Sequence, residues 1–149
     1  MNNLFPVFDV PAVLVANTRR TVRYLPAPLF DVESGEFILN GTRQVLYGSG
    51  VDAWVLWCTK TVMTQRWAHA AYSGNIGIEA DGAFKEPNRA AQESAFTRTI
   101  TEALLADPMG RTMQVRNFTY RWEPDSLYMS CEVVGFDRDT AAISAEIRR

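Results

Sequence analysis

Histidine is nearly missing from this chain: His69 is the only one among 149 residues. One histidine cannot supply most zinc-ligand sets, and any Ser-His-Asp triad would have to be built around that one position. No GxxxxGKS/T, HExxH or GxSxG motif occurs, and no GxGxxG follows a predicted strand. The sequence therefore gives no support to the common nucleotide-binding, metalloprotease and serine-hydrolase classes, and we expect neither a cofactor nor a metal.

A concentration of positive charge is also lacking. The formal net charge is −2, the isoelectric point is near 5.4, and the arginines are interspersed with acidic residues. Because nucleic-acid binding needs a basic stripe along the phosphates, nucleic acid is not an expected partner. No apolar run approaches the roughly 20 residues of a membrane helix, and residues 1–6 do not resemble a signal peptide. We expect no membrane association, and we expect synthesis in the cytoplasm.

Cysteine is scarce, with Cys58 and Cys131 alone and no CxxC spacing. Two cysteines without a CxxC spacing do not indicate a zinc site. Free cysteines are commonly buried as small apolar residues, so we expect two free core thiols. A cysteine nucleophile activated by His69 is the alternative, but nothing in the spacing supplies its orienting group.

What the sequence contains is an ordinary globular composition, 47% hydrophobic and 21% charged, in a length that suits one domain with arms. Residues 1–29 hold four prolines, which exclude a continuous helix or a central strand. The same segment is rich in Phe and Val, so we predict an extended arm that packs on its own domain or on a neighbour. A polar linker is the alternative.

The next elements are a hairpin and a helix. Asn40-Gly41, between the apolar runs 36–39 and 43–47, favours a hairpin with a type I′ turn. After Gly50, apolar residues recur at helical spacing and predict an amphipathic helix over about residues 51–66. The inward stripe of this helix consists of Val51, Trp54, Val55, Cys58 and Val62.

Residues 67–85 show no sustained period and predict a long connection. Pro87 suits the first turn of a second helix that runs to about Ala106, where Asp107-Pro108 stops it. Its inward face holds Phe96, Ile100, Ala103 and Leu104.

The rest of the chain predicts strands. Residues 113–122, with an irregularity near Asn117, and residues 127–136 flank a turn at 123–126. The end has a period of two and predicts one more strand, with a short amphipathic helix as the alternative; its apolar positions are Ala141, Ile143, Ala145 and Ile147. This narrow face predicts that loss of residues 140–149 costs the fold little. The fold class expected is α+β, two helices packed on antiparallel hairpins with an extended N-terminal arm and a C-terminal strand.

Two carboxylates, Glu79 and Asp81, lie close together in the long connection. Paired carboxylates can serve a glycosidase as acid and base. Neighbouring acids in a polar loop are more often solvated, so we treat a peptidoglycan-cleaving, lysozyme-like enzyme as the alternative and expect a protein that is not an enzyme.

The order and spacing of these elements resemble the sheath-initiator family, small baseplate proteins of contractile phage tails and related injection systems. The matching stretches span about residues 24–136: they are 30–37 before the hairpin, Thr64-Gln65-Arg66 and 72–79 after the first helix, and 100–108 at the end of the second. The resemblance divides the chain into an arm, 1–29, a sheath-initiator-like baseplate domain, 30–136, and a C-terminal strand or tail, 137–149.

The resemblance implies a structural protein of the virion tail baseplate that is present in several copies in a ring. It implies contacts with other baseplate wedge proteins, with the tail sheath protein and with tube or hub proteins. Family members often carry Glu-Pro-Arg after the second helix; here the positions read Asp107-Pro108-Met109, with Arg111 as the candidate replacement for the arginine. We therefore assign Asp107, Pro108 and Arg111 to wedge contact. The strand with Ala141, Ile143, Ala145 and Ile147 is assigned to pairing with the first sheath subunits.

Overall fold

The computed structural model describes residues 24–149, and in this part of the chain the α+β class is confirmed. The predicted arm therefore lies mostly outside the described residues. The elements in chain order are β1 (Ala27–Pro28), β2 (Tyr47–Gly48), α2 (Gly50–Met63), α3 (Ala80–Phe84), α4 (Arg89–Leu105), β3 (Thr112–Trp122), β4 (Ser126–Gly135) and β5 (Thr140–Arg148).

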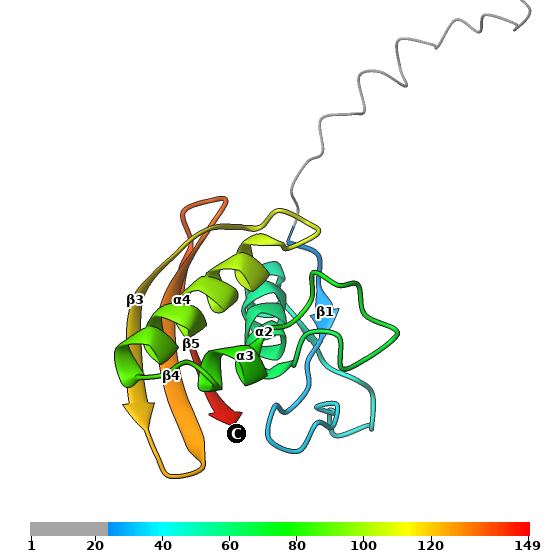
Figure 1. The fold of residues 1–149 in the computed structure, drawn as a ribbon. Coiled ribbons are helices and arrows are strands. Elements are labelled where there is room, and N and C mark those ends of the chain that lie inside the picture. Colours follow the sequence, from blue (N-terminus) through cyan, green and yellow to red (C-terminus); the bar gives the residue numbers. More distant parts are fainter. Residues whose placement is uncertain (1–23) are drawn as a thin grey trace, which may run out of the picture.

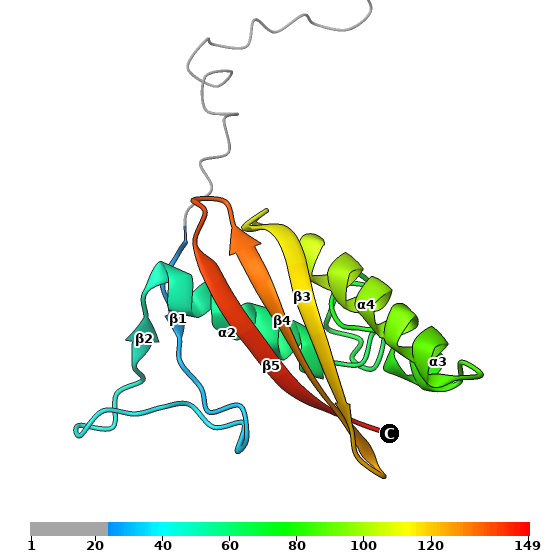
Figure 2. The same cartoon turned by 90° about the vertical axis from the view of Figure 1, so that its left-hand side faces the viewer.

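The largest sheet is antiparallel in the order β3-β4-β5. Helix α2 packs against β5 and α4 packs against β3, so both helices cover the same face of this sheet (Figure 1). The described residues leave the other face uncovered, and that face is turned toward the viewer in Figure 2. The C-terminal strand is thus confirmed, and the helical alternative for residues 141–148 is wrong.

The core lies between this sheet and the two helices. Both helical stripes are confirmed, because the face of α4 predicted to point inward is completely buried and α2 buries Trp54, Cys58 and Val62. The indole N–H of Trp54 donates to the hydroxyl of Thr112 at 2.9 Å, which satisfies a polar group at the centre of the core. Tyr24 packs on Trp54, with ring centroids 5.8 Å apart.

Glycine makes room for Tyr24. A Cβ at Gly135 would collide with the Tyr24 hydroxyl, and a Cβ at Gly50 would collide with the Tyr24 carbonyl. Both positions therefore need a residue without a side chain. Tyr24 is thereby held against the start of α2 and the end of β4.

Two details of the helices differ from the predictions. Pro87 precedes α4, and the helix begins after Asn88, whose side-chain oxygen accepts from the Ala91 N–H at 2.9 Å. The side chain of Asn88 satisfies a backbone donor that Pro87 cannot, so Asn88 sets the helix start. The long connection contains the short helix α3, which is a single turn or so and leaves no measurable period in the sequence.

The hairpin at Asn40 is present, but its predicted type I′ turn is wrong. Leu39 bridges Val45, and the loop between them places Arg43, not Gly41, in the left-handed region at φ 61°. The Asn40 side-chain oxygen accepts from the N–H groups of Thr42 and Gln44, each at 2.9 Å. Asn40 therefore begins a longer turn and does not occupy its centre, because its side chain serves as the local acceptor.

Candidate functional site

Strand β5 carries the residues that the sequence assigned to sheath contact, and its alternate side chains point into the core. Ile143, Ala145 and Ile147 are exposed by 1%, 8% and 6%, and Ala141 packs at the edge of the same cluster. The expectation that loss of residues 140–149 would cost the fold little is therefore wrong. The apolar side chains of β5 form only a narrow stripe, but this stripe completes the core by packing on α2. Its loss should therefore destabilise the fold. Any contact of β5 with another chain must use its backbone or its outward side chains.

The backbone of β5 has one free side. Gly135 N–H donates to the Asp139 carbonyl at 2.7 Å, and Arg149 N–H donates to the Asp125 carbonyl at 3.1 Å. Bonded pairs recur at every second residue of an antiparallel ladder, so residues 141, 143, 145 and 147 turn their N–H and C=O groups toward β4. Residues 140, 142, 144, 146 and 148 turn theirs outward, and within residues 24–149 these groups have no backbone partner.

The two outer edges of the sheet differ in regularity. Strand β5 follows β4 through nine consecutive pairs without a register shift. Strand β3 has two register shifts along β4, and Asn117 at the second lies in the left-handed region at φ 57°. Bulges of this kind disrupt the row of donors and acceptors that an added strand needs. Strand β5 is therefore the better template for another strand (Figure 2).

A groove of about 940 Å³ runs beside the second half of β5, at the upper end of the usual size of a ligand pocket, about 300–1,000 Å³. The groove is bordered by the end of α2 with residues that follow it, by Val32 and Glu33, by Tyr128 of β4, and by four residues of β5: Ser144, Glu146, Ile147 and Arg148. We call it the β5 slot. One wall of the β5 slot is the turn at residues 31–35, where the Ser34 hydroxyl donates to the Asp31 carboxylate at 2.8 Å. This hydrogen bond holds the pKa of Asp31 below its usual range.

The uncovered face of the sheet carries polar side chains. Arg116 forms an ion pair with Glu132 at 2.6 Å, and the Asn117 amide donates to the same carboxylate at 2.8 Å. The hydrogen bonds from Arg116 and Asn117 hold the pKa of Glu132 below its usual range. Arg121 lies over the ring of Tyr128 at 4.6 Å. Because these charged side chains already have partners, the unpaired backbone edge of β5 is the more distinctive feature of this side of the domain.

The residues assigned to wedge contact come together at the corner between α4 and β3. Arg111 donates from Nε to Asp107 Oδ2 at 2.7 Å and from Nη2 to Oδ1 at 3.1 Å. The same carboxylate accepts from the backbone N–H groups of Met109 and Arg111. The Asp107 side chain is 0% exposed and that of Arg111 7%, so this forked pair is an internal brace. Removal of either side chain should therefore harm the fold, and only Pro108 of the three residues is exposed.

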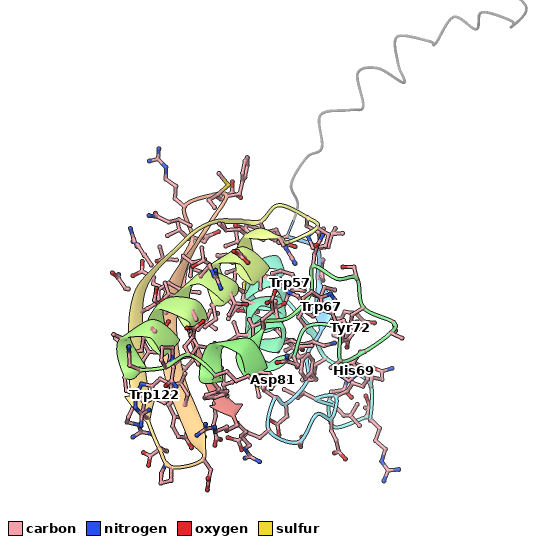
Figure 3. The ribbon with its side chains drawn as sticks, viewed as in Figure 1. Trp57, Trp67, His69, Tyr72, Asp81 and Trp122 are labelled. Carbon is pink, nitrogen blue, oxygen red and sulfur yellow. The ribbon has the colours of Figure 1, made fainter. Side chains whose placement is uncertain are left out.

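The residues considered for catalysis do not form an enclosed pair. Glu79 accepts from Arg66 at 2.9 Å, while Asp81 is exposed on α3. Burial raises the pKa of the Cys58 thiol to about 12 and that of Cys131 to about 11, so both are poor nucleophiles. Both thiols are free and buried, as predicted. Figure 3 shows His69 on the exposed loop between α2 and α3, next to Tyr72. The sequence had indicated no further residue that could orient His69 in a catalytic triad.

An exposed apolar face was missed by the sequence reasoning. Phe37, Leu39, Val45 and Tyr47 are exposed by 58%, 50%, 37% and 66%. The antiparallel bridge between Leu39 and Val45 and the alternation along each strand place all four on one face of the hairpin. Exposed clusters of large apolar side chains usually mark protein interfaces. The two apolar runs were visible in the sequence, but they were taken only as the strands that flank the Asn-Gly pair.

A protein-family model described as contractile injection system sheath initiator matches residues 28–137. The chain belongs to the sheath-initiator family. The match covers most of the chain and confirms the resemblance noted in the sequence, whereas no curated protein matches this chain. A sheath initiator is a structural component of a contractile injection system, which indicates a place in the tail or baseplate next to the sheath. Among residues 24–149, no helix of this sheath initiator is both long and apolar enough to cross a membrane.

Proposed function

We propose that this sheath initiator is a baseplate component that starts the sheath by offering the outer edge of β5 to an extended segment of the first sheath subunits. The observation that carries the proposal is the regular row of outward N–H and C=O groups along β5. Strand addition at such an edge draws affinity from main-chain hydrogen bonds and register from alternate side chains. The family match ends at residue 137, before β5, so this role rests on the geometry of the strand.

Ring assembly would strengthen this contact. If several copies stand in a ring, each edge needs only a modest affinity, because a sheath ring that binds several edges at once gains avidity. The sheath protein is then the partner at β5. Other wedge proteins, and tube or hub proteins, are the partners we propose for the remaining surface of the domain, within the tail baseplate of a phage or a related injection machine.

The corner at Asp107 is the wedge contact we propose, with roles that differ among its three residues. Pro108 is exposed and can touch a partner directly. Asp107 and Arg111 hold the corner in shape through their buried pair, so they would act on the wedge contact through the loop between them. The exposed hairpin face, Phe37 with Leu39, Val45 and Tyr47, supports a second protein contact.

A non-enzymatic role is part of this proposal. A lysozyme-like glycosidase is the alternative, and its two acids would be Glu79 and Asp81. The purified protein should release no soluble fragments from peptidoglycan. Turnover that is present in the wild type and lost in Glu79→Gln would overturn this part of the proposal.

A proline substitution at the outer edge of β5 tests the main proposal. Ser144→Pro removes an outward N–H and leaves the bonds to β4, since proline is tolerated on an edge strand whose N–H faces outward. Ser144→Ala is the matched control, because it keeps that N–H and removes only the hydroxyl that donates to Ser130. Ser144→Pro baseplates should carry a tube without an ordered sheath, while Ser144→Ala baseplates should assemble normally. Sheaths of normal number and length on Ser144→Pro baseplates would place the nucleating contact elsewhere.

A further inference from the structure

The hairpin face lies on a part of the domain that stands apart from the three-stranded sheet. Strands β1 and β2 pack on α2, and Figure 2 shows them beside the sheet, together with the loops at residues 30–46. The apolar surface here extends beyond the four side chains of the face, because Leu25, just before β1, is 54% exposed. A contiguous apolar surface of this kind usually has a partner that covers it.

Residues 1–23 contain a segment whose chemistry matches this surface. Residues 4–15 hold nine apolar side chains, two prolines and a single charged residue, Asp9. Apolar side chains are driven to a surface of the same character because both then leave water. Pro6 and Pro11 lack the N–H that a regular strand ladder needs, so the contact would be made by side chains.

This segment is joined to the domain next to the hairpin face. Tyr24 is held by the packing described above, and Ala27, three residues later, pairs with Gly48 at the base of the hairpin. From Gly48 to Val45 the hairpin strand spans about 10 Å at roughly 3.4 Å per residue. Residues 16–23 form a connector of eight residues, which reaches up to about 27 Å when extended. The chain's own segment can therefore reach the face.

The charges of the connector and of the domain are complementary. Residues 16–23 contain three arginines and no acidic residue. The turn at residues 31–36 leads directly into Phe37 and contains Asp31, Glu33 and Glu36 but no basic residue. All three acids are exposed, and within residues 24–149 none of them forms an ion pair. Opposite charges of this kind add orientation more than affinity.

We propose that residues 4–15 cover the hairpin face of their own chain in the free protein, with the arginines of residues 16–23 beside the acidic turn at residues 31–36. A segment on so short a connector is present at an effective concentration in the millimolar range, which a second copy does not reach in dilute solution. The inference concerns the free protein and does not depend on the role of β5. A baseplate partner that uses the hairpin face would have to displace this segment.

A spin label on the segment tests the contact in the full chain. Asp9→Cys carries the label, because the two native cysteines are buried and position 9 leaves the apolar side chains intact. In ¹⁵N-labelled protein the amide signals of Leu39 and Val45 should be broadened. Signals as sharp as those of the unlabelled protein would overturn the proposal.

A matched pair of variants shows whether apolar side chains make the contact. Phe5→Leu with Phe8→Leu should keep the broadening. Phe5→Asp with Phe8→Asp should lower the equilibrium constant for docking at least about tenfold, since each change removes the partial burial of an aromatic side chain. Equal broadening in the two double variants would overturn the assignment of residues 4–15 to the face.

A mixture of two protein samples distinguishes the chain's own segment from that of a second copy. Unenriched protein that carries the spin label is mixed with ¹⁵N-labelled protein that does not. The signals of Leu39 and Val45 should stay sharp in the mixture, although they are broadened when the label and the isotope are in the same chain. Broadening in the mixture would show exchange between copies and would overturn the proposal.

Charge exchange tests the placement of the connector. Glu33→Lys with Glu36→Lys should weaken docking roughly three- to tenfold, because two exposed attractions become repulsions. Adding Arg19→Glu and Arg20→Glu to this variant should restore the broadening at Leu39. An undiminished signal change in the lysine variant, or a loss that the glutamates do not reverse, would overturn the pairing of the connector with the turn.

Discussion

Replacement of Asp107 by alanine should destabilise the domain strongly although Asp107 lies in a loop. The substitution leaves the Arg111 guanidinium, whose side chain is 7% exposed, without its carboxylate, and it removes the acceptor of two backbone N–H groups. Removal of one partner of a buried ion pair typically costs about 3–5 kcal/mol. Against a total stability of about 5–15 kcal/mol, this is a large fraction, and we expect a loss of about 3–5 kcal/mol.

Urea unfolding followed by tryptophan fluorescence measures this loss, with the slope m as a check that the unfolded state is unchanged. The control is Asp107→Asn combined with Arg111→Met, which keeps an acceptor for the backbone and removes both charges. Since no unpaired charge then stays buried, the double variant should lose less than Asp107→Ala alone. A loss below about 1 kcal/mol for Asp107→Ala, the size of an ordinary surface change, would refute the reasoning. A double variant that folds can also test wedge incorporation without the ion pair.

Three further outcomes follow from the core. Trp54→Ala should lower the free energy of unfolding by about 3–5 kcal/mol, because the Trp54 side chain is 0% exposed. If urea unfolding shows a loss of stability under about 1 kcal/mol, Trp54 is not a core residue. Deletion of residues 140–149 should give a chain without cooperative thermal unfolding, since Ile143 and Ile147 leave the core with it; a folded, cooperative remnant would contradict this. Cys58 and Cys131, whose thiols have pKa values raised to about 12 and about 11, should stay unreactive toward a disulfide reagent at pH 8 until urea unfolds the chain; fast reaction in the native state would contradict their burial.

Much of the fold could be predicted from periodicity. The stripes of α2 and α4 and the alternation in β3, β4 and β5 identified the elements because each buries one face against a single core. The turn at Asn40 could not be predicted from the Asn-Gly pair, since the side chain of Asn40 makes hydrogen bonds that favour a longer loop. The start of α4 was misplaced for a similar reason. The side chain of Asn88 accepts a hydrogen bond from the first turn of the helix, whereas Pro87 lies before the helix and does not cap it.

The candidate site was predicted less well, because its character depends on tertiary contacts. The sequence showed that β5 alternates, but it could not show that the apolar side closes the core and that the backbone edge alone remains for a partner. Likewise, the spacing of Asp107 and Arg111 allowed a contact with a partner or with each other. Only the folded corner, with both side chains buried, distinguishes the two.

The most direct test of the account is a cryo-electron microscopy reconstruction of the junction between the baseplate and the first sheath ring. The account predicts an extended segment of sheath protein beside β5, bonded to the outward groups of residues 144–148. A junction in which that edge faces solvent, or in which the sheath meets β3 instead, would contradict the claim that this initiator starts the sheath through β5.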